Sequence, residues 1–167
     1  MVNPSTISKD ELSILLEQIH DPEIPVLTIQ DLGMVRDVSW VNDHWKIVIT
    51  PTYTACPAVD AILEDIGTLL NQQNIPHQLE VTLSPAWTTD WMTQQARQKL
   101  KAYGIAPPVE QSDHVCGIQL FQKEVTVHCP QCNSDQTSLL SSFGSTACKA
   151  LYKCNHCLET FDYFKCH

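Results

Sequence analysis

Two pairs of cysteines constrain most what this chain can fold into. Cys129 and Cys132 form one C-x-x-C motif, and Cys154 and Cys157 form a second, with twenty-one residues between the motifs. A two-residue spacer lets both thiolates of a motif face one point, so two motifs complete a tetrahedral four-sulfur site. A segment of ~40 residues with few apolar side chains usually needs a metal or disulfides to fold. The pattern therefore predicts a zinc ribbon over residues 122–167, with zinc as a structural cofactor.

Other chemistries for these thiols stay open at this point. Four thiolates also suit iron in a rubredoxin-like redox centre, which absorbs visible light where zinc does not, and one dithiol pair could act alone as an oxidoreductase. Cys148 and Cys166 are additional thiols near the second motif, and each either replaces a ligand or is a spare, buried cysteine. Cys116 is assigned no role.

The charge balance argues against one class of function. The 167-residue chain has a formal net charge of −9 and no cluster of Lys and Arg. Because nucleic-acid binding relies on neutralising phosphates, we expect no nucleic-acid partner.

No stretch approaches the ~20 apolar residues of a membrane span, and the start has no signal-peptide pattern. We therefore expect no membrane association and a cytoplasmic location, where the eight cysteines stay reduced.

The first 104 residues carry the periodicities of an α+β domain. Ser8 and Glu11 have the spacing of a capping box ahead of an apolar helix. Residues 34–50 alternate apolar and polar side chains on either side of Asn42-Asp43, which predicts a β-hairpin.

The remainder of this segment predicts three more elements. Apolar residues recur at helical spacing from Ala58, and residues 77–85 alternate as a third strand. Thr88 and Thr89 offer a cap for a last helix that Gly104 would end. The order helix-strand-strand-helix-strand-helix predicts a three-stranded sheet with helices against it. The apolar positions expected to be buried are Leu79, Val81 and Leu83 in the strand and Met92, Ala96, Leu100 and Tyr103 in the last helix.

A segment rich in proline and polar residues separates the two parts. Residues 105–121 lack periodicity and are interpreted as a linker. The predicted organisation is thus an α+β domain over residues 1–104, the linker, and the zinc ribbon over residues 122–167.

Cys56 lies at the junction between the hairpin and the second helix. If Pro57 is the first helical residue, Cys56 is the N-cap, and the helix dipole and free N–H groups favour its thiolate. Such placement can lower a cysteine pKa from ~8.5 toward neutrality. Acids in the next two turns oppose this, so a functional thiolate and a buried small residue remain equal alternatives. Those acids are Asp60, Glu64 and Asp65.

Asp21 and Glu23 lie in a stretch stiffened by two prolines. They could be hard metal ligands near Cys56, or ordinary capping or solvated carboxylates, which is the more usual fate of acids in such turns.

Several longer motifs resemble known families. The stretches "DPEIPVLTIQDLGMV", "TPTYTACPA" and "SPAWTTDWM" resemble the iron–sulfur-assembly-associated domain of SufT-type and cytosolic iron–sulfur targeting proteins. Together with "YGIAPP", "CPQC", "FGSTACKALYKC" and "FDYFKC", they make the chain similar over nearly its full length to the PaaD family. PaaD proteins are encoded with the multicomponent phenylacetyl-CoA epoxidase of bacterial aerobic phenylacetate degradation.

The resemblance implies an accessory role and no catalysis by this chain. In that system oxygenation is attributed to a di-iron subunit and electron delivery to a reductase with flavin and an iron–sulfur cluster. These oxygenase and reductase subunits are the implied partners, and assembly of one of their metal centres is the implied task. Cys56 would be a transient contact for iron or a cluster, with Asp21 and Glu23 beside it.

One cysteine cannot hold a cluster alone, so a homodimer or a partner would supply further ligands. The competing interpretation is a stoichiometric structural subunit of the epoxidase that carries only structural zinc.

Overall fold

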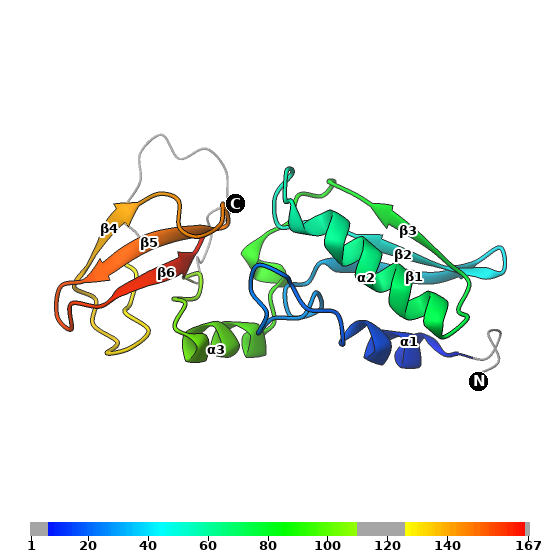
Figure 1. Cartoon of the computed structure of the whole chain (residues 1–167), viewed down its shortest axis with the longest axis horizontal. Helices are drawn as coiled ribbons and strands as arrows, with labels where there is room; N and C mark the ends of the chain where they lie inside the picture. Colours follow the sequence, from blue (N-terminus) through cyan, green and yellow to red (C-terminus); the bar gives the residue numbers. More distant parts are fainter. Residues whose placement is uncertain (1–6, 110–125, 166–167) are drawn as a thin grey trace. The chain divides into compact units, whose positions relative to one another are not determined.

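The structure is a computed structural model that describes residues 7–109 and 126–165 (Figure 1). The chain divides into two compact units, one up to Trp87 and one from Thr88. Within the described ranges, none of the helices combines the length and the apolar character that a membrane crossing requires.

The first unit is a small α+β fold, as predicted. It contains α1 (Lys9–Leu16), β1 (Val35–Val41), β2 (His44–Ile49), α2 (Ala58–Gln72) and β3 (His77–Val81). β1 and β2 are antiparallel, and β3 pairs with β2 in parallel, which gives the sheet order β1-β2-β3. Parallel neighbours need a crossover, and α2 makes it while covering one face of the sheet (Figure 1).

Local chemistry explains where these elements begin and turn. The Ser8 backbone N–H donates to Glu11 Oε2 (2.8 Å) and the Glu11 N–H donates to Ser8 Oγ (3.2 Å), which is the predicted capping box. Asn42 and Asp43 both have positive φ (47° and 62°), as a type I′ hairpin turn requires. Buried side chains of the sheet and of α2 form the core, among them Ile47, Ile49, Ile62, Ile66 and Leu70.

The third strand differs from its prediction. β3 ends at Val81, and both Val81 (42% exposed) and Leu83 (50% exposed) face solvent. β3 is an edge strand of the sheet, so two of the three predicted apolar positions have no neighbouring element to bury them.

The second unit contains a turn of 3₁₀ helix, a helix and a second sheet. These elements are η1 (Thr89–Trp91), α3 (Gln94–Tyr103), β4 (Thr137–Ser141), β5 (Lys149–Cys154) and β6 (Thr160–Phe164). The three strands form an antiparallel sheet in the order β4-β5-β6. Its small core consists of Ala106, Val127, Cys129, Ala150, Cys154, Phe161 and Tyr163.

The last helix starts later than expected. Thr88 caps only η1, and Thr93 Oγ1 accepts the Ala96 N–H (3.0 Å) to cap α3, because a 3₁₀ turn intervenes. Met92 therefore lies outside the helix although it is buried. Gly104 ends the helix in the left-handed region (φ 93°), as predicted.

The segment around α3 groups with the ribbon, whereas the sequence placed a boundary at Gly104. Arg97 donates to the carbonyl oxygens of Thr89 (2.9 Å) and Pro108 (2.7 Å). Ala106 forms a parallel bridge to Tyr163 in β6, and its N–H donates to Asp162 (2.8 Å). The beginning of the predicted linker is thus part of the second unit's core.

Candidate metal sites

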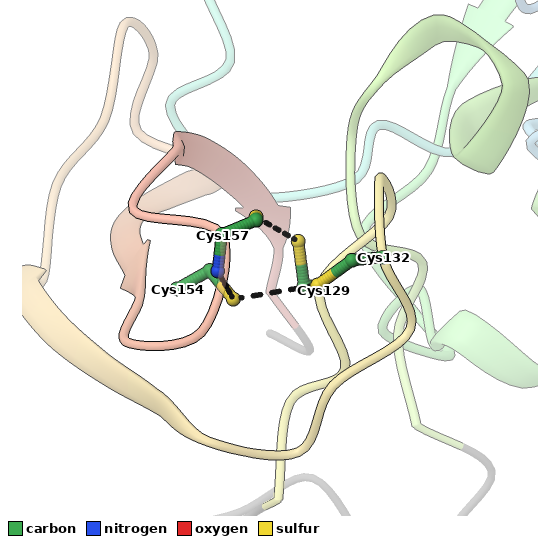
Figure 2. A group of neighbouring side chains, drawn as sticks. All are labelled: Cys129, Cys132, Cys154 and Cys157. Carbon is green, nitrogen blue, oxygen red and sulfur yellow. Dashed lines mark hydrogen bonds between the residues drawn. The ribbon is translucent and has the colours of Figure 1, made fainter.

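The four motif cysteines meet at one point of the second unit. Their sulfurs all lie within 4.8 Å of one another, with 3.7 Å between Cys129 and Cys157 and 3.6 Å between Cys132 and Cys154 (Figure 2). Four sulfurs at ~2.3 Å from a tetrahedral zinc are separated by ~3.8 Å. The spacing observed between the thiols therefore fits structural zinc and leaves no open coordination position.

The two motifs have the same backbone geometry. The Cys129 N–H donates to Ser134 O (2.9 Å), and the Cys154 N–H donates to Glu159 O (2.8 Å), in each case five residues further on. The residue after the second cysteine of each motif has positive φ: Asn133 (61°) and Leu158 (68°). This repeated loop turns both cysteines of a motif toward the same point, which is what the two-residue spacer predicts.

The pKa values of Cys154 and Cys157, in the second motif, shift in opposite directions. Backbone N–H groups, first that of Cys157 at 3.4 Å, lower the pKa of Cys154 to about 6. The Glu159 N–H favours the Cys157 thiolate, but burial and the three neighbouring sulfurs outweigh it and raise the pKa of Cys157 to about 12. Ionisation of Cys157 is therefore favoured by a bound cation, as expected where metal binding releases protons.

The additional cysteines do not join this cluster in the part of the chain that the structure describes. Cys148 is buried (4% exposed) and lies 2.9 Å from Thr146 Oγ1, outside the group of four. Cys116 and Cys166 lie outside the described residues.

Cys56 is predicted to be the N-cap of the second helix, but it lies one residue before the N-cap. Helix α2 starts at Ala58 with Pro57 as its N-cap, and no side chain caps it. The Cys56 N–H donates to Tyr53 O (3.2 Å), while the Cys56 carbonyl accepts from Val59 (3.3 Å). Cys56 is therefore the residue before the N-cap, and its side chain is half-buried.

Of the opposing effects on the Cys56 thiol that the sequence left open, those that disfavour the thiolate prevail. Burial raises its pKa most; the Ala58 N–H lowers it, the carboxylates of Glu23 and Asp21 raise it again, and the Tyr53 side chain lowers it slightly. The net effect is a pKa above the ordinary thiol value, because partial burial and two nearby negative charges disfavour the thiolate. Asp21 and Glu23, from a loop more than thirty residues away in the sequence, thus lie within electrostatic reach of Cys56.

Asp21 also has a structural role. It is buried (6% exposed), and its Oδ1 accepts the backbone N–H groups of Glu23 and Ile24, both at 2.8 Å.

Just after β2, in the segment that leads to Cys56, the hydroxyl of Thr50 is buried and has no hydrogen-bond partner among the described residues. An orphaned polar atom of this kind is unusual in a folded core.

Cys56, Asp21 and Glu23 do not form a closed ligand set. Among the described residues, the four ribbon cysteines are the one group of three or more candidate ligands whose atoms lie within 4.8 Å of one another. One thiol with two carboxylates in the vicinity does not complete the coordination of a resident metal ion. Such a set suits an ion that is bound only during transfer and that brings further ligands with it.

Tyr53 was not singled out from the sequence. Its side chain hydrogen-bonds Cys56, and the signal that could have revealed it is its place three residues before the cysteine in a Thr- and Tyr-rich turn.

We expect Glu23→Gln to lower the pH at which the Cys56 thiol becomes reactive, because the substitution removes a negative charge that raises its pKa. The rate of iodoacetamide labelling of the Cys56 peptide, followed by mass spectrometry from pH 7 to pH 10, measures this. Asp60→Asn is the matched control, since Asp60 is not among the groups that shift Cys56. An equal shift in both variants would mean that overall charge, and not this loop, sets the pKa of Cys56.

Two family models match separate segments of the chain. The model described as an iron-sulfur cluster assembly protein matches residues 9–73, and the PaaD zinc beta ribbon domain matches residues 114–165. The first segment contains Asp21, Glu23 and Cys56, and the second contains all four clustered cysteines.

Individual proteins are similar to nearly the whole chain or to a little more than half of it. An Escherichia coli protein described as a putative subunit of 1,2-phenylacetyl-CoA epoxidase is 52% identical over 157 residues, 93% of this chain and 92% of that protein. An Fe-S protein maturation auxiliary factor of Porphyromonas gingivalis is 31% identical over 104 residues, 60% of this chain and 97% of that protein. The crystal structure of a domain of unknown function, DUF59, from Bacillus anthracis superposes with a TM-score of 0.51 and 29% identity, covering 55% of this chain and 90% of its own.

Proposed function

The chain belongs to the PaaD family of phenylacetyl-CoA epoxidase subunits, and we propose that it is an accessory, non-catalytic component of that epoxidase. Its task is to assist assembly of an iron–sulfur or di-iron centre in the oxygenase or reductase subunits. It acts in the cytoplasm, where the thiols that this requires stay reduced.

The observation that carries this proposal is the placement of the Asp21 and Glu23 charges within electrostatic reach of Cys56. A thiol with a raised pKa is mostly protonated at neutral pH and is a poor nucleophile, which argues against a thiol enzyme. The same two carboxylates attract a cation, and an arriving iron ion displaces the thiol proton and favours the thiolate. Cys56 is therefore suited to contact iron or a cluster during transfer.

The ribbon has a separate role. Cys129, Cys132, Cys154 and Cys157 hold zinc as a structural ion, and the ribbon serves as a docking module for the epoxidase subunits. Iron at the first unit is passed on to another subunit, whereas zinc stays bound to the ribbon. A homodimer or a client protein supplies the ligands that the Cys56 loop lacks.

We expect Cys56→Ser to lower epoxidase maturation at least fivefold. The epoxidase subunits are co-expressed with the wild-type chain or the variant, and the iron and sulfide content of the reductase, the di-iron occupancy of the oxygenase and the epoxidase rate are measured. Cys116→Ser is the control, because it also removes one thiol. If all three readouts stay at the wild-type level with Cys56→Ser, Cys56 has no part in assembly.

A structural subunit of the epoxidase is the second candidate, favoured by the Asp21 carboxylate, which already accepts two backbone N–H groups. Titration of the chain against epoxidase subunits that lack their metals separates the two functions. Full activation by a substoichiometric amount of chain supports maturation, whereas activation that requires one chain per complex supports the structural subunit.

A further inference from the structure

A groove of about 420 Å³ lies in the first unit, and Cys56 is not among the residues that line it. One wall is the end of α1 and the loop that follows it, and the other wall is the C-terminal half of α2; Figure 1 shows this loop running alongside α2. Pro22, Pro25, Asp65 and Gln72 line it and are exposed, so the groove is open to solvent.

The lining combines apolar surface with negative charge. Pro22, Pro25 and Leu69 supply apolar contacts, and Asp65 supplies an exposed carboxylate, while neither lysine nor arginine is among the described residues that line the groove. Asp21 also lines the groove, but it is buried and its Oδ1 accepts two backbone N–H groups. The whole first unit has three Lys and Arg against twelve Asp and Glu, whereas the charges of the second unit balance. An occupant of this groove is therefore cationic and carries apolar surface.

A bare metal ion does not fit these residues. His20, Asp21 and Asp65 line the groove, but they do not bring three ligand atoms within 4.8 Å of one another. His20 Nδ1 is moreover engaged with the Pro25 carbonyl oxygen (2.8 Å). A single exposed carboxylate beside apolar surface suits a planar, forked cation that can pair with both of its oxygens, and the arginine guanidinium has that shape and keeps its charge.

We propose that this groove receives an arginine side chain, with a neighbouring apolar residue, from a surface segment of a partner protein. The guanidinium lies against Asp65, and the apolar residue packs on Leu69 and the two prolines. Asp21 lines the groove and its charge also acts on Cys56, so a partner docked here contacts the same loop that influences that cysteine. The proposal does not depend on Cys56 acting on a metal.

The test uses the full-length, ¹⁵N-labelled chain and the blocked dipeptide acetyl-Leu-Arg-amide, followed by NMR. We expect saturable shifts of the His20, Leu69 and Gln72 amides with a millimolar Kd. Acetyl-Leu-citrulline-amide has the same shape without the charge, and we expect it to bind at least fivefold more weakly. Asp65→Asn should weaken arginine binding at least threefold, while Asp60→Asn, an equal charge change on the same helix outside the groove, should leave it unchanged.

Shifts that do not saturate, or that are largest outside the groove, would overturn the proposal. So would equal binding of the citrulline peptide, or equal effects of the two aspartate variants. Equal affinity for acetyl-Leu-Lys-amide would overturn the choice of arginine. The spectra of both variants show directly whether they are folded, so each result can be interpreted.

Discussion

Replacing Cys129 by Ser should unfold the ribbon and leave the first unit intact. Cys129 is fully buried and is one of four thiols that fit a single zinc ion. Structural zinc contributes ~10–16 kcal/mol to the folding of small zinc-dependent peptides, more than a core of this size supplies by itself. We expect less than one zinc per chain and complete loss of the β4-β5-β6 sheet. Amide exchange at Ala150 and Phe161, compared with Ile47 in β2, measures both units in one experiment.

Removing zinc with a chelator should have the same effect on the wild-type chain, and lowering the pH should release zinc because protons compete for the thiolates. Cys148→Ala is the control, since it removes a buried cysteine of the ribbon that lies outside the group of four. It should keep one zinc per chain. A ribbon that stays folded without metal would show that its few apolar residues are enough to stabilise the fold.

Local patterns predicted the parts of this fold that depend on neighbouring residues. The paired motifs brought four cysteines together because a two-residue spacer fixes the direction of both thiols wherever the loop occurs. The capping box at Ser8 and the turn at Asn42-Asp43 are likewise decided within four residues. None of these features requires knowledge of what lies across the core.

Features that depend on distant parts of the chain were not predicted. Helix α3 groups with the ribbon because Ala106 pairs with Tyr163, and no pattern near Gly104 signals a partner nearly sixty residues away. Exposure of Val81 depends on β3 being an edge strand, which alternation alone does not reveal.

The candidate site shows the same limit. Pro57 in the sequence indicated a helix start next to Cys56, which favours the thiolate, while acids in the following turns oppose it, so the balance stayed open. The pKa of Cys56 is raised because burial and the charges of Glu23 and Asp21 outweigh the Ala58 N–H. The acids expected to oppose the thiolate were those next in sequence, whereas the acids that do so come from a loop folded against it.

Asp21 therefore allows the structural and the electrostatic roles of this loop to be separated. Its Oδ1 accepts two backbone N–H groups, and Ile24, which donates one of them, is buried. A buried donor that loses its acceptor costs ~1–3 kcal/mol. We expect Asp21→Ala to lower the free energy of unfolding of the first unit by roughly 2–4 kcal/mol, measured by urea denaturation.

Asp21→Asn keeps an acceptor oxygen in the same position and removes the charge. We expect it to cost less than about 1 kcal/mol of stability while lowering the pKa of Cys56, in the same direction as Glu23→Gln. If Asp21→Asn destabilises the unit as much as Asp21→Ala does, the charge itself, and not the two hydrogen bonds, holds the loop. Normal maturation with a folded Asp21→Asn chain would then assign Asp21 to the structure of the loop, whereas loss of maturation in that folded variant would assign its charge to the handling of the incoming metal.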